Sequence, residues 1–215
     1  MEFALLSGLA ESDRRQVLSK ARRRRFGRRE VIFHEGDPGE SIHLVDSGHV
    51  GIRITTPGGD AAMVRIVRPG EFFGELALLS EGPRSATAIA IDAAQTLSIA
   101  RNELEELRRR SAAVNDVIIT ALATEVRRLA AAQVEAMYLP ADKRVSRRLL
   151  EAARSFGSVT PVTVPLTQDE IAQLAGATRP TVNRLLVDAR DANAITLSRG
   201  RVDVIDLAWV ERRGR

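Results

Sequence analysis

The chain of 215 residues contains no cysteine, and this absence excludes several kinds of site at once. Disulfides, thiolate catalysis, cysteine-ligated zinc and iron–sulfur clusters all require cysteine. The three histidines, His34, His43 and His49, lie in or beside predicted strands, without metal-ligand spacing and without a nucleophile motif around them. We therefore predict a protein that is not an enzyme and that holds no metal, haem or iron–sulfur cluster.

Long apolar runs are missing as well. No run approaches the roughly 20 residues that a membrane-spanning helix needs. The first residues, Met1 to Leu6, lack the basic start and long apolar centre of a signal peptide. A cytoplasmic protein without a membrane partner is the expectation.

Lysine is scarce, since only Lys20 and Lys143 occur, and arginine carries most of the positive charge. Residues 1–139 hold 19 Lys and Arg against 19 Asp and Glu, whereas residues 140–215 hold 13 against 9. The whole formal charge of +4 therefore lies in the last third, which is the candidate binder of a polyanion. The run Arg22–Arg25 is interpreted as solvated surface between a short helix and a strand at 30–33.

Turn residues divide the first half of the chain into short segments. Residues 4–21 have the pattern of short helices, and residues 26–99 that of many short strands separated by glycines. This density of turns predicts a β-roll of the jelly-roll kind. The glycines are Gly36, Gly48, Gly58, Gly59, Gly70 and Gly82.

A long helix is predicted from about 103 to 139. Along it, residues recur at alternating intervals of four and three, the seam spacing of a coiled coil, which favours dimerisation. Pro140 then ends or kinks the helix and creates a hinge at 139–142. The predicted seam consists of Ile118, Leu122, Glu125, Leu129, Ala132, Ala136 and Leu139.

The last third has the pattern of a winged helix-turn-helix. A helix at 144–156 and a small strand at 162–164 precede a capping box, Thr167 to Glu170, that opens the next helix. After the turn at 175–177, Thr178 caps a second helix with Val182, Leu185 and Leu186 facing inward. Strands at 195–197 and 202–205 form the wing around Ser198–Arg201. The predicted DNA contacts are Thr167, Gln168, Thr178, Arg179, Thr181, Asn183, Arg184, Arg199 and Arg201.

The run Phe73–Leu79, followed by Pro83–Ala86, contains what is needed to hold a small phosphodiester. Gly74 allows close backbone approach, and a helical turn from Glu75 would aim free N–H groups at an anion. Arg84 supplies a planar fork of donors for two phosphate oxygens, and Ser85 adds a hydroxyl. Because a carboxylate repels phosphate, the natural partner of Glu75 is a ribose hydroxyl.

These residues resemble the phosphate-binding cassette of cyclic-nucleotide-binding domains, which reads Gly-Glu-Leu-Ala-Leu-Leu, three variable residues, then Pro-Arg-Ser or Pro-Arg-Ala. Gly36-Asp37, Ile42–Val45, Gly48 and Val50 also resemble early parts of that domain. The resemblance implies that Glu75 binds the ribose 2′-hydroxyl and Arg84 the cyclic phosphate. The predicted ligand-binding residues are Gly74, Glu75, Leu76, Ala77, Arg84, Ser85, Ala86 and Gln133.

Residues 166–184 resemble the DNA-binding domain of the cyclic-AMP receptor protein (Crp/Fnr) family. The resemblance implies an α+β chain with a cyclic-nucleotide-binding β-roll at 1–110, a dimerisation helix at 111–139 and a winged helix-turn-helix at 140–215. It further implies a cytoplasmic bacterial transcription regulator whose effector is cyclic AMP or another cyclic nucleotide. The implied partners are a two-fold symmetric double-stranded DNA operator, a second copy of the chain and RNA polymerase.

Two departures from the family pattern bear on specificity. Responsive members hold the adenine partly through Thr and Ser on the dimer helix, whereas the corresponding stretch here, 129–133, has no hydroxyl and offers Gln133. In the recognition helix, Pro180 replaces the usual glutamate, which accepts a hydrogen bond from cytosine. Arg179 and Arg184 remain candidates for guanine, and Asn183 for adenine.

A second interpretation stays open. The chain could bind DNA constitutively or architecturally, with the pocket vestigial or occupied by another anion. DNA binding that depends steeply on salt but ignores both sequence and cyclic nucleotide would distinguish it. The intact Glu75 and Arg84 favour the sensor.

Overall fold

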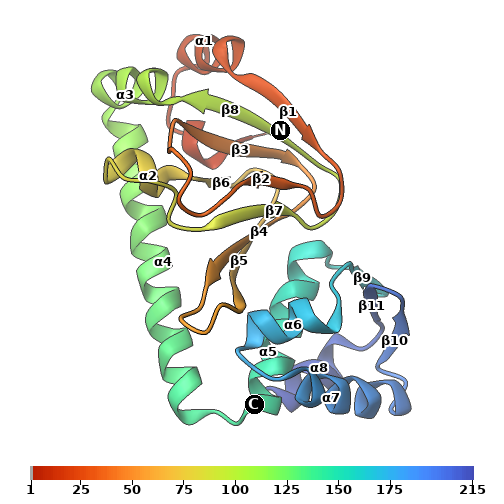
Figure 1. Cartoon of the computed structure of the whole chain (residues 1–215). Coiled ribbons are helices and arrows are strands. Elements are labelled where there is room, and N and C mark those ends of the chain that lie inside the picture. Colours follow the sequence, from red (N-terminus) through yellow and green to blue (C-terminus); the bar gives the residue numbers. More distant parts are fainter. Residues whose placement is uncertain (1) are drawn as a thin grey trace. The chain divides into compact units, whose positions relative to one another are not determined.

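A computed structural model describes residues 2–215, and its contacts divide the chain into two compact units. One unit contains the chain up to Gly58 together with Arg65–Arg128, and the other contains Gly59–Val64 together with Leu129–Arg215. The first is a β-roll with helices and the second a helical unit with a small sheet, as Figure 1 shows. The predicted α+β class is confirmed, and the boundaries at 110 and 139 stay a prediction. Within residues 2–215, no helix has both the length and the hydropathy to cross a membrane.

Two four-stranded antiparallel sheets form the roll. One sheet has the order β1-β8-β3-β6 and the other β2-β7-β4-β5. The strands are β1 (Arg22–Phe26), β2 (Val31–Phe33), β3 (Ser41–Ser47), β4 (Val50–Thr55), β5 (Ala61–Val67), β6 (Phe72–Phe73), β7 (Thr87–Ala90) and β8 (Ala94–Ala100). Strand β1 begins at Arg22, four residues before the position 26 at which the first strand was expected, and it contains the run Arg22–Arg25. Its side chains are exposed, which agrees with a solvated surface.

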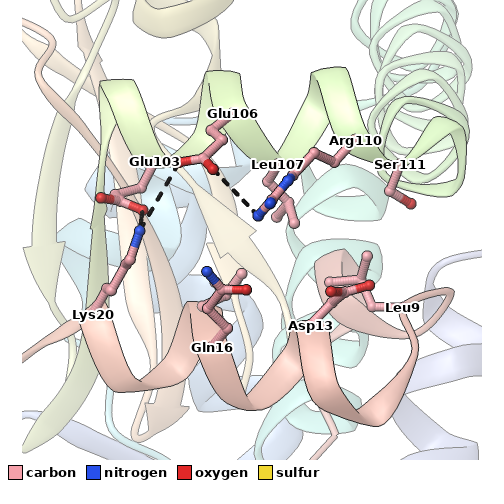
Figure 2. Close-up of a pocket in the computed structure, with 10 residues that line it drawn as sticks. Leu9, Asp13, Gln16, Lys20, Glu103, Glu106, Leu107, Arg110 and Ser111 are labelled. Carbon is pink, nitrogen blue, oxygen red and sulfur yellow. Dashed lines mark hydrogen bonds and ion pairs between the residues drawn. The ribbon is translucent and has the colours of Figure 1, made fainter.

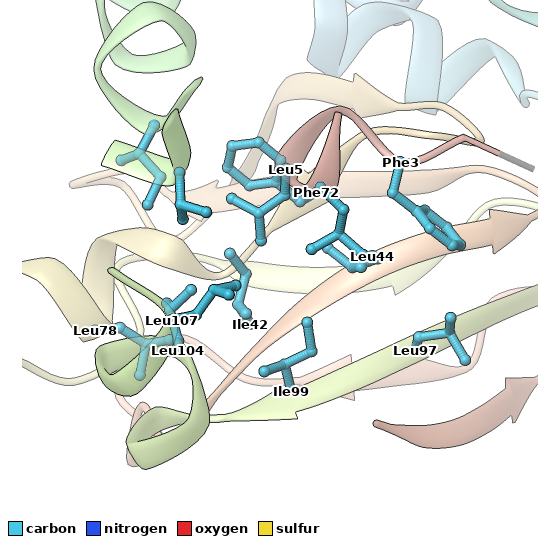
Figure 3. Packing of buried hydrophobic residues seen from close by; sticks show 13 residues of the cluster. Phe3, Leu5, Ile42, Leu44, Phe72, Leu78, Leu97, Ile99, Leu104 and Leu107 are labelled. Atoms are coloured by element: carbon cyan, nitrogen blue, oxygen red, sulfur yellow. The ribbon is translucent and has the colours of Figure 1, made fainter. Parts of the chain in front are cut away.

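The side-chain alternation of β3 separates two cores. His43 and Val45 face the space between the sheets, where Val45 packs with Val50 and Phe73. Ile42 and Leu44 face the other side, which is covered by η1 (Ala4–Leu6), α1 (Glu11–Lys20) and α3 (Arg101–Arg110). Figure 3 shows the second core. Strand β3 therefore contributes side chains to both hydrophobic cores of the first unit.

The long helix predicted over 103–139 is interrupted. The structure has α3 (Arg101–Arg110) and α4 (Ala112–Tyr138), separated by Ser111 with extended backbone angles. The Asn115 amide donates to the Arg108 carbonyl oxygen at 3.0 Å, and Arg108 Nε donates to Asn115 Oδ1 at 2.9 Å. This side chain therefore satisfies one of the carbonyl groups that the end of α3 leaves free.

The predicted seam along α4 is wrong at its first position. Ile118 is 3% exposed and packs in the roll core with Val114. One residue onward, Ile119 is exposed, and so are Val126 and Met137, seven and eighteen residues from it. These spacings are close to whole numbers of helical turns, so the exposed apolar stripe is rotated by about one residue from the predicted seam. Leu129 belongs to both sets.

The second unit contains the predicted winged helix-turn-helix. Its helices are α5 (Ala141–Phe156), α6 (Gln168–Ala175), α7 (Arg179–Asp191) and α8 (Leu207–Arg213), and its sheet has the order β10-β11-β9. The strands are β9 (Val162–Val164), β10 (Ile195–Ser198) and β11 (Arg201–Val204). Helix α5 begins at Ala141, directly after Pro140, and three residues earlier than expected. Helix α8, capped by Asp206, was not predicted.

Arg144 joins two backbone segments of the second unit through three carbonyl oxygens. Its Nη1 donates to the carbonyl oxygen of Leu139 at 2.9 Å, just beyond the end of α4. Its Nε and Nη2 donate to the carbonyl oxygens of Ala175 and Gly176 at 3.1 and 2.8 Å, in the turn between α6 and α7. The hinge segment and the helix-turn-helix turn thus share one side chain.

Candidate functional site

The predicted cassette forms a tight turn followed by a short helix. Gly74 adopts a left-handed conformation with φ +85° and precedes α2 (Glu75–Leu79). A Cβ on Gly74 would lie 2.6 Å from Arg84 Nη1, so a side chain there would displace the guanidinium. Because the first N–H groups of a helix have no intrahelical acceptor, the turn offers free donors beside Arg84.

Arg84 is 5% exposed and lies within the cassette. Its Nη1 donates to the Gly74 carbonyl oxygen at 2.9 Å and its Nη2 to Ser41 Oγ at 3.2 Å. The guanidinium carbon lies 4.0 Å from the centre of the Phe33 ring, a cation–π contact. Nε is buried and has no hydrogen-bond partner among the residues that the structure describes.

Burial dominates the electrostatics of both charged cassette residues. Burial lowers the pKa of Arg84, and Arg101 lowers it further, whereas Asp37, Glu75 and Glu40 oppose the shift. Burial also raises the pKa of Glu75, against the nearby cations Arg65 and Arg84. Both shifts disfavour the charged form of the group, because burial outweighs the opposite charges nearby.

The residues present fit an anion that carries a hydroxyl group. A buried donor without a partner is costly, and Arg84 Nε is such a donor. Three guanidinium hydrogens remain after the bonds to Gly74 and Ser41 are made, and phosphate oxygens suit them. Glu75, an acceptor, complements a hydroxyl. A cyclic ribose phosphate carries both groups.

The other predicted ligand residues differ in exposure. Leu76 is 46% exposed and Ser85 is exposed. The side chains of Ala77 and Ala86 are buried, which leaves their backbone as the part that could contact a ligand. Gln133 belongs to the second unit, where it is exposed on α4.

The structure adds residues that the sequence did not indicate. Ser41 and Phe33 both contact the Arg84 guanidinium, although they lie 43 and 51 positions away along the chain. Arg101 donates to the carbonyl oxygens of Gly39, Ala77 and Leu78 at 2.7, 3.1 and 3.2 Å and so fixes the end of α2. No local motif signals these contacts, because pairing of distant strands creates them.

A second candidate surface is formed by α6, α7 and the wing. The capping box is present, since Thr167 Oγ1 accepts from Glu170 N at 3.2 Å and Glu170 Oε2 accepts from Thr167 N at 2.8 Å. Thr178 caps α7, with Pro180 in its first turn. Val182, Leu185 and Leu186 are buried as predicted.

The predicted DNA contacts form an exposed arginine-rich face. Arg179, Asn183, Arg184, Arg199 and Arg201 are exposed, whereas Thr167, Gln168 and Thr181 are half-buried and Thr178 is exposed. Two of the cations face carboxylates, because Arg179 lies 3.5 Å from Asp169 and Arg201 lies 3.4 Å from Asp203. Across residues 2–215, no hydrogen bond or ion pair engages Arg184 or Arg199. Both guanidinium groups are available to an anion.

Asn183 and Gln168 join the two helices of this face. Asn183 Nδ2 donates to Gln168 Oε1 at 3.3 Å. Beside them, a hollow of about 280 Å³ lies between the start of α6 and the wing. Its lining includes Gln168, Arg179, Arg199 and Arg201. The arrangement matches a surface that follows a phosphate backbone.

Another hollow lies between α1 and α3, and none of the predicted site residues lines it (Figure 2). The ion pair Lys20–Glu103, at 2.7 Å, joins α1 to α3 beside it, and Arg110–Glu106, at 3.2 Å, lies along α3. Its volume of about 30 Å³ admits little more than water. In the part of the chain that the structure describes, no group of three His, Asp or Glu side chains could hold a metal ion.

Family models match both units. Residues 23–111 match a cyclic nucleotide-binding domain and residues 143–213 a Crp-like helix-turn-helix domain. The chain is 35% identical to the cyclic AMP receptor protein of Thermus thermophilus over 210 residues, covering 96% of this chain and 94% of the relative. It is 32% identical to the CRP-like cAMP-activated global transcriptional regulator of Mycobacterium tuberculosis over 194 residues, with coverage of 88% and 87%.

Solved structures give the same relationship. The crystal structure of the Thermus thermophilus catabolite activator protein matches with a TM-score of 0.57 and 32% identity, over 98% of each chain. A CRP-family transcriptional regulator from the same organism, TTHB099, matches with a TM-score of 0.74 and 27% identity, over 89% of this chain and 96% of that one.

Proposed function

We propose a function for this chain on the premise that it belongs to the Crp/Fnr family of transcription regulators, which are not enzymes. In this proposal the chain is a dimeric regulator whose DNA binding responds to cyclic AMP. The observation that carries this proposal is the buried Nε of Arg84, beside Gly74 and Glu75, which has no hydrogen-bond partner in the described part of the chain. In it, Arg84 and the α2 N–H groups hold the cyclic phosphate and Glu75 holds the ribose 2′-hydroxyl. The relatives named for cyclic AMP support that ligand. The base contact of Gln133 stays a prediction from the sequence.

The proposed response is allosteric. Two recognition helices enter successive major grooves only when they are about 34 Å apart, one turn of DNA. A ligand that favours this arrangement by ~1–3 kcal/mol changes DNA affinity by ~5–150-fold. The exposed stripe of α4, with Ile119, Val126 and Met137, supports α4 as the surface that joins a second copy. The cytoplasm is the expected location, and RNA polymerase a further expected partner.

Calorimetric titration with cyclic AMP and with cyclic GMP, paired with a DNA-binding assay with and without each nucleotide, tests the proposal. We expect cyclic AMP to bind and to raise DNA affinity. DNA binding that ignores both nucleotides, or that ignores DNA sequence, would instead favour the constitutive binder.

Specificity at the operator gives a separate prediction. Because Pro180 has no acceptor for a cytosine amino group, selection from random DNA should return a half-site that departs from the family's common one at that position. Pro180→Glu should shift the selection toward the common half-site. Recovery of the unchanged half-site with the wild-type protein would contradict the prediction.

Substitutions of the arginines of α7 and of the wing should affect DNA binding in different ways. Arg184→Ala should cost about 1–3 kcal/mol and relax the preference at one base pair. Arg199→Ala should weaken all sequences alike and reduce the salt slope by about 1.

A further inference from the structure

A chain of side chains leads from Arg84 into the core between the two sheets of the roll. Arg84 Nη2 donates to Ser41 Oγ at 3.2 Å, Ser41 Oγ lies 3.3 Å from His43 Nε2, and His43 Nδ1 lies 3.1 Å from Thr96 Oγ1. Arg84, His43 and Thr96 are buried, with 5%, 7% and 0% exposure. The predicted functions of the cassette do not use Ser41, His43 or Thr96.

One set of hydrogen-bond directions connects these groups into a continuous chain. A guanidinium only donates, so Ser41 Oγ accepts from Arg84, and its own proton can be donated to His43 Nε2. In that arrangement His43 Nε2 is the acceptor, and the ring proton lies on Nδ1, which donates to Thr96 Oγ1. This pattern requires a neutral imidazole. A protonated ring would turn Nε2 into a second donor facing Ser41.

The surroundings of His43 favour the neutral form. Burial, together with the cations Arg84 and Arg24, lowers the pKa of His43 to about 3. The ring is also held by aromatic packing, stacked on Phe73 with a centroid distance of 5.1 Å and tilted against Phe33 at 5.9 Å. Phe33 is the same ring that faces the Arg84 guanidinium, so packing and hydrogen bonds restrain the same two groups.

We propose that Ser41 and His43 are positioning residues that hold the Arg84 guanidinium ready for an anion. Gly74 O, Ser41 Oγ and the Phe33 ring restrain three sides of the group, while Nε and one hydrogen on each terminal nitrogen stay available for phosphate oxygens. His43 acts through Ser41, because it fixes the hydroxyl so that its lone pair faces Arg84. A group held in its binding geometry loses less entropy on binding.

The proposal rests on the cassette being an anion site, and two variants with one control variant test it. Ser41→Ala removes the acceptor, and Ser41→Thr keeps it. His43→Phe combined with Thr96→Val keeps an aromatic ring beside Phe73 and a branched side chain at position 96, while it removes both polar ends of the bond between these two residues. We expect Ser41→Ala and the double variant each to weaken cyclic nucleotide binding by about 10-fold, the effect of one hydrogen bond to a charged group, and Ser41→Thr to restore it.

A readout without ligand separates this proposal from the proposed function. Side-chain ¹⁵N NMR of the unliganded full-length protein should show separate Nη1 and Nη2 signals for Arg84, because a held guanidinium rotates slowly. These signals should merge in Ser41→Ala and in the double variant, whereas those of Arg101, held by three carbonyl oxygens, should stay separate. Unchanged Arg84 signals in both variants would overturn the positioning role. Wild type that binds neither cyclic AMP nor cyclic GMP would refute the proposed function, and the NMR comparison would still decide this one.

Discussion

Arg84→Ala is expected to lower the affinity for a cyclic nucleotide by at least about 100-fold, since each hydrogen bond to a charged group contributes about 1.5–3 kcal/mol and the guanidinium offers at least two. The side chain is buried and its Nε has no partner among residues 2–215, so no group there replaces it. Isothermal titration calorimetry with cyclic AMP and cyclic GMP measures the change.

The control for this result is Arg22→Ala, which removes the same charge from an exposed position on β1. Arg84→Lys keeps the charge but loses the planar fork, and an intermediate affinity is expected. Thermal unfolding without ligand shows whether each variant is folded. A folded Arg84→Ala protein with wild-type affinity would refute the phosphate role.

Acidification is expected to destabilise the fold through His43. The unfolded imidazole binds a proton below pH 6.5, whereas burial lowers the folded pKa to about 3, so between these values unfolding takes up a proton. Stability that is present above pH 6.5 is therefore lost as the pH falls toward 3. At pH 4 the loss from this residue is about 3 kcal/mol, at 1.36 kcal/mol per pH unit.

Urea unfolding at pH 7 and pH 4 gives the change in the free energy of unfolding for wild type and for a variant without His43, and the difference between the two changes measures this loss. The variant with His43→Phe and Thr96→Val should lose about 3 kcal/mol less than wild type between these pH values. Glu75 and Glu125 also titrate, but both proteins keep them, so their contributions cancel. Parallel losses in the two proteins would show that His43 is not the source.

The sequence predicted most accurately where the determinants are local. The capping box Thr167–Glu170, the cap at Thr178 and the glycine turn before Glu75 each involve residues a few positions apart. The break at Ser111 was missed because Asn115 satisfies the end of α3 through a contact that no periodicity reveals.

Contacts between segments that are distant along the chain could not be predicted from motifs or periodicity. The seam position Ile118 has the right helical spacing, but its burial depends on how α4 packs on the roll. Ser41 reaches Arg84 only because β3 places it beside the cassette, and nothing in its neighbourhood along the chain marks it. The ligand residues Gly74, Glu75 and Arg84 could be predicted because a motif of twelve residues contains all three.

The three acceptors of Arg144 are peptide carbonyl oxygens. The nature of these acceptors determines how the connection responds to pH and to ionic strength. A carbonyl does not titrate between pH 4 and pH 9, and no second charge is present for dissolved ions to screen. The proposed phosphate contact of Arg199 would weaken steeply as salt rises. The link between the hinge segment and the turn should therefore persist at an ionic strength that dissociates the DNA complex. Salt would then release the operator while the connection between the helix-turn-helix and the segment after α4 stays intact.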